Sequence, residues 1–104
     1  MRKKIANELK NTPPRYRFRL FIAGDGPKSQ RARETLNHIC KTHLKGNYTL
    51  EVIDVLEDYK AALDNNILLA PTLIIESHQL QSRIIGSLDD AQKVLEILGL
   101  SGFE

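Results

Sequence analysis

The residues that could carry chemistry in this chain are a single cysteine, three histidines and a few isolated carboxylates. Cys40 lies where apolar residues recur at helical spacing, and a cysteine buried among apolar side chains is unreactive. His38 and Cys40 are two positions apart, so on a helix they point in different directions and form no metal-ligand pattern with His43 or His78. We therefore predict no metal site and no catalytic cysteine.

The segment Gly24–Gln30, which follows a predicted strand and opens a predicted helix, is the second place where chemistry could occur. It contains no cysteine, which excludes the Cys-x-x-Cys pair whose thiolate a helix N-terminus would activate. Its Gly-x-Gly is too short for a phosphate loop. Ser29 is the one candidate nucleophile, and a serine near a helix start is ordinarily a cap or a surface residue. We expect no cofactor site here.

Three aspartates could suggest acid–base catalysis, but each has a simpler structural interpretation. Asp54 follows a strand, where capping of a loop is usual, and Asp58 is placed to cap the next helix. Asp64 lies near the end of that helix, and none of the three has an obvious catalytic partner. We predict that the protein is not an enzyme and that its function resides in a surface.

The charge of the chain is unevenly distributed between a leader and a folded part. With 104 residues and 41% hydrophobic composition, we expect one domain. Residues 1–15 carry a net charge of +4, so the remainder carries −2, and Pro13-Pro14 separates the leader from a domain at 16–104. The folded part lacks the basic patch of a nucleic-acid binder. No membrane span or secretory signal is present, and we expect a cytoplasmic protein.

Hydrophobic periodicity predicts the element order strand, helix, strand, helix, strand, strand, helix. The predicted strands cover 16–23, 48–55, 72–76 and 80–85, and the first two helices cover 27–44 and 57–66. Ser87 is a predicted cap for the last helix, which ends at Gly99. Glycines are expected at three turns: Gly24 in the loop after the first strand, Gly46 after the first helix and Gly86 at the end of the last strand. The buried stripes of the helices are expected at Ala32, Leu36, Ile39, Cys40 and Leu44, at Tyr59, Ala62 and Leu63, and at Ala91, Val94, Leu95 and Leu98.

The helical crossovers allow strands one and two, and then two and three, to run parallel, with an antiparallel hairpin at the end. The apolar Val52-Ile53 in strand two indicates a sheet covered on both faces. The order βαβαββα is that of the thioredoxin fold, a three-layer α/β fold with a mixed four-stranded sheet. Because that fold places a cis-proline before its third strand, we predict that the Ala70–Pro71 bond is cis.

Residues from about Tyr16 to Leu98 resemble the KaiB family. The stretches that carry the resemblance are Leu20-Phe21-Ile22-Ala23-Gly24, Pro27, Ser29, Arg31-Ala32, Lys45-Gly46, Val52-Ile53-Asp54-Val55-Leu56, Pro71-Thr72-Leu73 and Arg83-Ile84-Ile85-Gly86. The resemblance implies a non-enzymatic protein that docks on a KaiC-type ATPase ring in circadian signalling. Further implied partners are a KaiA-like protein and an output histidine kinase.

The resemblance also implies a second fold, because KaiB proteins switch between a thioredoxin-like form and a tetrameric ground state that differs in the second half of the chain. Family members often carry a proline run between the third and fourth strands. Here that stretch is residues 76–80, Glu-Ser-His-Gln-Leu, which can form an ordinary hairpin. We expect the thioredoxin-like state to be the stable one; a dimer and a tetramer both stay open.

Charge is the other departure from the family pattern. Glu34, Glu51 and Glu57 stand where cyanobacterial proteins tend to be basic, whereas three basic residues remain as candidate partner contacts, namely Arg31, Lys45 and Arg83. Docking on a KaiC-type ring is therefore one hypothesis. A KaiB homologue outside a true clock, acting in stress adaptation or signalling with another partner, is a second. A degenerate enzyme of the thioredoxin superfamily is a third, against which the absent cysteine pair argues.

Overall fold

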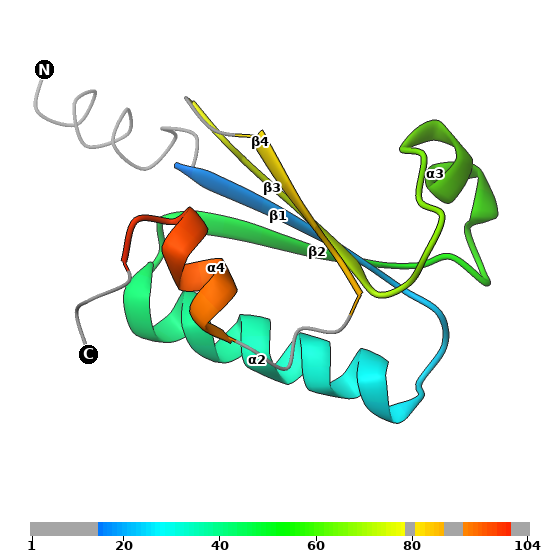
Figure 1. Ribbon diagram of the computed structural model, residues 1–104, viewed down its shortest axis with the longest axis horizontal. Coiled ribbons are helices and arrows are strands. Elements are labelled where there is room, and N and C mark those ends of the chain that lie inside the picture. The colour runs from blue at the N-terminus through cyan, green and yellow to red at the C-terminus, as the bar shows by residue number, and fades with distance from the viewer. Residues whose placement is uncertain (1–14, 79–80, 87–90, 101–104) are drawn as a thin grey trace, which may run out of the picture.

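The computed structural model describes residues 15–78, 81–86 and 91–100. The expected order of strands and helices is confirmed (Figure 1). The elements are β1 (Tyr16–Ile22), α2 (Pro27–His43), β2 (Tyr48–Asp54), α3 (Tyr59–Asp64), β3 (Thr72–Ser77), β4 (Gln81–Ile85) and α4 (Ala91–Ile97). The leader before Arg15 and the predicted cap at Ser87 lie outside the described residues.

The ends of α2 follow from local sequence signals. Pro27 opens the helix, where its missing N–H leaves no hydrogen bond unmade. Beyond the last turn, Gly46 adopts a φ of +78°, a conformation that glycine reaches without the steric cost of a Cβ. Cys40 is fully buried within α2, as predicted, because it lies on the same stripe as Leu36 and Ile39.

The sheet has the order β2-β1-β3-β4. β1 pairs parallel with β2, as expected, and the β3–β4 pair is the predicted antiparallel hairpin. The expectation that strands two and three run parallel is wrong, because β3 pairs antiparallel with β1 and does not adjoin β2. Leu20 thus lies between Val52 of β2 and Leu73 of β3.

The position of α3 accounts for the direction of β3. This helix lies beyond the end of the sheet and not along one of its faces (Figure 1). The chain therefore enters β3 at the end of the sheet where β2 stopped, and β3 runs back in the opposite direction.

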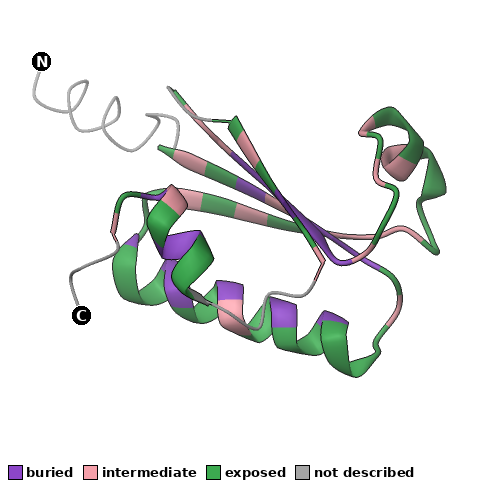
Figure 2. Cartoon of the chain, in the orientation of Figure 1, coloured by how far each residue is buried: buried purple, intermediate pink, exposed green. Residues whose placement is uncertain are grey.

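The main hydrophobic core lies between one face of the sheet and the two helices α2 and α4 (Figures 1 and 2). Its fully buried side chains include Phe18, Leu20, Leu36, Leu73, Ile75 and Val94. Leu95 and Leu98 of the predicted α4 stripe are also buried, while the side chain of Ala91 is outside the described part. Figure 2 shows the buried positions of α2 along the side that faces the sheet. This arrangement positions the α2 N-terminus beside the start of β3.

The opposite face of the sheet is only partly covered. Phe21 and Ile74 are buried there, under the segment that follows α3. β2 is an edge strand, however: Val52, which pairs with Leu20 on the helix-covered face, remains 37% exposed, and Ile53, which pairs with Phe21 on the opposite face, is half-buried. The expectation that the sheet is covered on both faces is therefore wrong at β2. A strand at an edge leaves part of its apolar surface in solvent whatever its composition.

The Ala70–Pro71 peptide bond is cis, as the strand order predicted. Gly86 ends β4 with a φ of +96°, and its N–H donates to the Pro71 carbonyl. With the β3–β4 hairpin formed, the described chain has the thioredoxin-like α/β arrangement rather than the alternative fold.

Candidate functional site

The thiol of Cys40 is kept from chemistry by its position. It is fully buried in the core, and loss of water around the thiol raises its pKa to about 12. A thiol with this pKa stays protonated near neutral pH, and the nucleophilic species is the thiolate. The prediction that Cys40 is buried is therefore confirmed.

The carboxylates are engaged in structural roles. Asp54 accepts hydrogen bonds from the N–H groups of Gly24 (3.1 Å) and Leu56 (3.0 Å), which joins the loop after β1 to the loop after β2. Asp58 caps α3 by accepting from Ala61 N–H at 3.1 Å. Both roles were predicted. Within the described ranges, no group of three or more His, Cys, Asp or Glu side chains is arranged to hold a metal ion.

The three basic residues proposed as partner contacts do not share a surface. Arg31 lies near the start of α2, and Lys45 follows its end, about 18 Å or more along the helix axis. Arg83 lies on β4, where it faces the other side of the sheet from α2. Its guanidinium donates to the carbonyls of Asn65 (2.9 Å) and Asn66 (3.1 Å). Arg83 therefore holds the segment after α3 onto the sheet.

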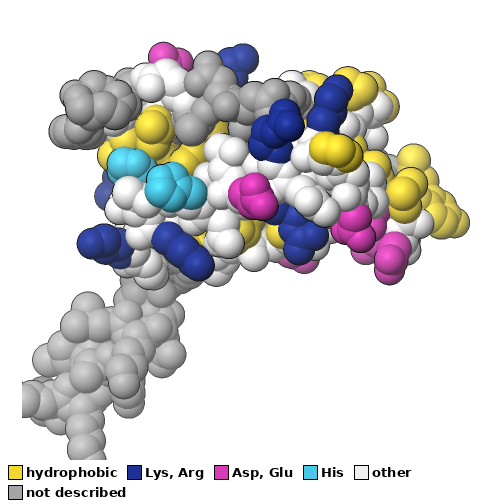
Figure 3. Space-filling view, turned by 90° about the horizontal axis from the view of Figure 1, so that it is seen from below, with side chains coloured by type: hydrophobic (Ala, Val, Ile, Leu, Met, Phe, Trp, Pro, Cys, Tyr) yellow, Lys and Arg dark blue, Asp and Glu magenta, His cyan; other side chains and the backbone are white. Residues whose placement is uncertain are grey.

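The most distinctive exposed feature is a group of apolar side chains on and around α3, which we call the apolar end surface. Figure 3 shows hydrophobic side chains gathered at the end of the molecule that α3 occupies in Figure 1. Their exposed fractions run from 54% to 95%. The residues of this surface are Leu56, Tyr59, Leu63, Leu68 and Leu69. Soluble proteins rarely leave such a concentration of large apolar side chains in water unless a partner covers it.

The prediction that Tyr59, Ala62 and Leu63 form a buried stripe is therefore wrong. Tyr59 is 71% exposed, Leu63 is 68% exposed and Ala62 is only half-buried. The spacing was correct for one face of a helix, but α3 extends past the end of the sheet and has no layer opposite that face (Figure 1). The sequence did carry one signal: residues 56–69 are rich in large apolar residues, while the helix among them is too short to bury them.

Polar contacts, rather than a core, hold α3 and the apolar end surface in place. Besides the two bonds from Arg83, the Arg19 guanidinium donates to the Asn65 side chain at 3.0 Å and lies 3.6 Å from the Glu76 carboxylate. Asn65 also closes α3 by donating from its side chain to the Ala61 carbonyl at 2.8 Å. The two arginines and Asn65 thus form a polar clamp between the sheet and the end of α3.

Comparison with known proteins identifies the family. The family model of the KaiB domain matches residues 19–100, which is most of the chain. The chain belongs to the KaiB family. It is 44% identical over 80 residues to a circadian clock oscillator protein KaiB of Acaryochloris marina, covering 77% of each chain. It is also 44% identical over 89 residues to that of Picosynechococcus, covering 86% of this chain and 83% of the relative.

Solved structures agree with the fold of this KaiB-family chain. Chloroplastic thioredoxin z superimposes with a TM-score of 0.72 over 93% of this chain and 86% of its own, at 19% identity. Mitochondrial thioredoxin 3 of Saccharomyces cerevisiae gives a TM-score of 0.68 over 94% and 89%, at 16% identity. At these identities the likeness establishes the thioredoxin-like fold alone. In the described part of this KaiB-family chain, no helix is both long enough and apolar enough to cross a membrane.

Proposed function

We propose that this KaiB-family protein is a cytoplasmic, non-enzymatic regulator that docks on a KaiC-type ATPase ring through the apolar end surface. Its relatives are circadian clock oscillator proteins over most of their length, which supports a clock-type role. The observation that carries the proposal is the exposure of five large apolar side chains within residues 56–69. An exposed apolar patch of this kind is typical of a protein-binding surface.

The apolar end surface can supply part of the free energy of specific binding. Full burial of one large apolar side chain contributes about 1.5–3 kcal/mol. Five side chains that are 54–95% exposed can therefore supply several kcal/mol against the association cost of about 4–15 kcal/mol. The remainder must come from polar contacts around the apolar centre. We propose Arg31, near the start of α2, as a contact outside that centre, and Lys45, about 18 Å or more farther along the helix axis, as a contact with a more distant part of the ring.

The position of Arg83 supports a different role from the contact first expected. Because its guanidinium holds the carbonyls of Asn65 and Asn66, we propose that it positions the apolar end surface. Leu68 and Leu69 follow these two residues, so displacement of the segment would disperse the surface. Arg83 thus acts through α3 and not by touching the ring.

A second candidate function is binding to a different protein partner in stress adaptation. It is favoured by the exposed acidic residues Glu57 and Asp58, which lie within the apolar end surface between Leu56 and Tyr59. Such acidic groups require a basic counterpart on the partner and would repel an acidic one. A KaiC-type ring that binds this chain must therefore carry basic residues around its apolar site.

Native mass spectrometry of the full chain with the KaiC-type ATPase from the same source, with and without ATP, tests the proposal. We expect stoichiometric, nucleotide-dependent binding. Leu68→Asp, at a side chain 95% exposed, should weaken binding by at least about tenfold without destabilising the fold. Asn37→Asp adds the same charge on the exposed side of α2 and should bind like wild type.

Two outcomes would contradict the proposal. Failure to bind the ring at high micromolar concentration would favour the second candidate function. Binding of Leu68→Asp with unchanged affinity would show that the ring uses another surface.

A further inference from the structure

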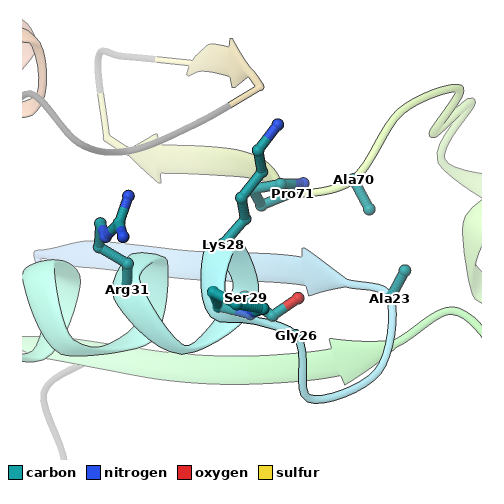
Figure 4. A pocket seen from close by; sticks show the side chains of 8 residues that line it. Ala23, Gly26, Lys28, Ser29, Arg31, Ala70 and Pro71 are labelled. Carbon is teal, nitrogen blue, oxygen red and sulfur yellow. The ribbon is translucent and has the colours of Figure 1, made fainter.

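A pocket at the N-terminus of α2 has the features of a ligand site that docking on a ring does not require. It encloses about 540 Å³ between the start of α2, the end of β1 and the residues that precede β3 (Figure 4). Pockets of about 300–1,000 Å³ are typical of small-molecule sites. Its lining residues are Ala23, Gly26, Pro27, Lys28, Ser29, Arg31, Ala70 and Pro71.

The start of α2 presents hydrogen-bond donors to this pocket. The helix is 17 residues long, its N-cap is Gly26, and no side chain caps its first turn. The N–H of Gln30 already donates to the Gly26 carbonyl, which leaves the N–H groups of Lys28 and Ser29 as the donors of the first turn. The first turn contains no acidic residue; the nearest carboxylate is that of the exposed Asp25, one residue before the N-cap.

Ser29 provides the second, independent indication of a ligand. Its side chain is 95% buried, since only 5% is exposed, yet it lines the pocket. Figure 4 shows its hydroxyl directed toward the space beside Pro71 and Ala23. No hydrogen bond joins this hydroxyl to any residue in the described ranges. Among the described residues, the fully buried side-chain atom left without a partner is Arg19 Nε and not the Ser29 hydroxyl. The hydroxyl is therefore open to the pocket, where an acceptor atom on a ligand can take its hydrogen bond.

The charges and the walls of the pocket define the class of ligand. Lys28 and Arg31 bring positive charge to the lining, and Arg31 also takes part in an interaction within the protein. The other walls are mainly apolar, from Ala23, Pro27, Ala70 and Pro71. This small number of charges suits a carboxylate, and the apolar walls suit a ligand with an apolar body rather than inorganic phosphate.

We propose that this pocket binds a carboxylate carried on a small apolar group. The carboxylate oxygens accept from the first-turn N–H groups and from the Ser29 hydroxyl, with the Lys28 ammonium nearby. The apolar group packs against Pro71 and Ala23. The same chemistry is offered by a free organic acid and by the terminal carboxylate of a peptide. The proposal concerns binding alone: no bond is made or broken, and the Cys40 thiol lies within the core.

An NMR titration of the uniformly ¹⁵N-labelled full chain tests this proposal. The probes are N-acetyl-leucine, which represents a peptide terminus, hexanoate, which represents a free acid, and N-acetyl-leucine methyl ester as the uncharged match. We expect at least one acid to bind with a dissociation constant on the order of 1 mM and to shift the amides of residues 24–26, 28–31 and 72–73. The ester should bind at least about tenfold more weakly.

The preferred acid identifies the natural source of the carboxylate, and either preference supports the site. Two results would overturn the proposal. One is the absence of saturable shifts from both acids at concentrations about fiftyfold above the expected dissociation constant. The other is equal binding of the acid and its ester, which would mean that the pocket does not recognise the carboxylate.

Variants separate the proposed contacts from general effects on the fold. Ser29→Ala should weaken acid binding by about tenfold while leaving amide shifts away from the pocket unchanged. Lys28→Gln should weaken it by about threefold, and Lys41→Gln, at an exposed lysine near the other end of α2, should bind like wild type. Unchanged binding by Ser29→Ala would refute the assignment. Because no ring is present in the assay, its outcome is independent of the proposed docking function.

Discussion

Replacement of Arg83 by glutamine is the sharpest perturbation of the clamp that holds α3. The substitution removes the two hydrogen bonds from the guanidinium to the carbonyls of Asn65 (2.9 Å) and Asn66 (3.1 Å). The side chain is exposed, so each bond contributes about 0.5–1 kcal/mol rather than the larger value of a buried charged pair. The total is about 1–2 kcal/mol, which corresponds to a factor of about 5–30 in a local opening equilibrium.

Native-state amide hydrogen exchange measures that opening directly. The N–H groups of Asn66 and Ile67 donate to the Leu63 and Ala62 carbonyls, so they report on the end of α3. In Arg83→Gln we expect these amides to exchange about 5–30 times faster, with core amides of β1 unchanged.

Arg17→Gln is the matched control for this measurement. Arg17 is exposed on the same face of the sheet and makes only a 3.9 Å contact with Glu76, so its loss should leave the Asn66 and Ile67 amides unaffected. Equal protection of these amides in Arg83→Gln and wild type would refute the clamp. Faster exchange throughout the core would instead show that Arg83 stabilises the whole domain.

Two further predictions concern Cys40 and Asp54. Burial raises the Cys40 pKa from 9.0 to about 12, so the native state holds the thiol proton more tightly than the unfolded state does. The free energy of unfolding should be unaffected below pH 9 and should fall as the pH rises toward 12. Maleimide labelling of Cys40 at pH 8 should proceed only through unfolding. Labelling of native protein as fast as a free thiol would contradict this. Asp54→Ala removes the acceptor for two backbone N–H groups and should cost about 1–3 kcal/mol, lowering Tm by about 4–8 °C per kcal/mol. Asp64→Ala, which loses only an exposed ion pair with Lys60, should melt within about 2 °C of wild type, and an equal loss in both variants would exclude a special role for Asp54.

Local sequence signals predicted those parts of the fold that depend on neighbouring residues. The limits of α2 depend on Pro27 and on the glycine after its last turn, and both act within a few residues of where they stand. The burial of Cys40 depends on its place in a stripe that repeats every three or four residues. The cis Ala70–Pro71 bond was predictable because the order of elements specified the fold.

Features that depend on distant residues were predicted less well. The direction and partner of β3 depend on which end of the sheet the chain reaches after α3, and the sequence pattern of β3 is the same in either case. In the sequence, nothing distinguishes Arg83 from an ordinary surface charge. Its contacts with Asn66 and Asn65, 17 and 18 residues earlier in the chain, form only because the fold brings β4 to the end of α3. The interpretation of Ser29 as a cap or a surface residue is wrong, because it caps nothing and is only 5% exposed, and its place in a pocket appears only when β3 is placed beside α2.

The amino-acid sequence by itself determined the order of elements, the absence of a cysteine pair at the start of α2 and the resemblance to the KaiB family, because each is written in residue types and short spacings. The tertiary structure alone decided which apolar side chains stay in water. Tyr59 and Leu63 have the spacing of a buried stripe, but periodicity specifies only which side chains share a face. Burial needs a second surface opposite that face, and α3 lies beyond the end of the sheet that would have supplied it.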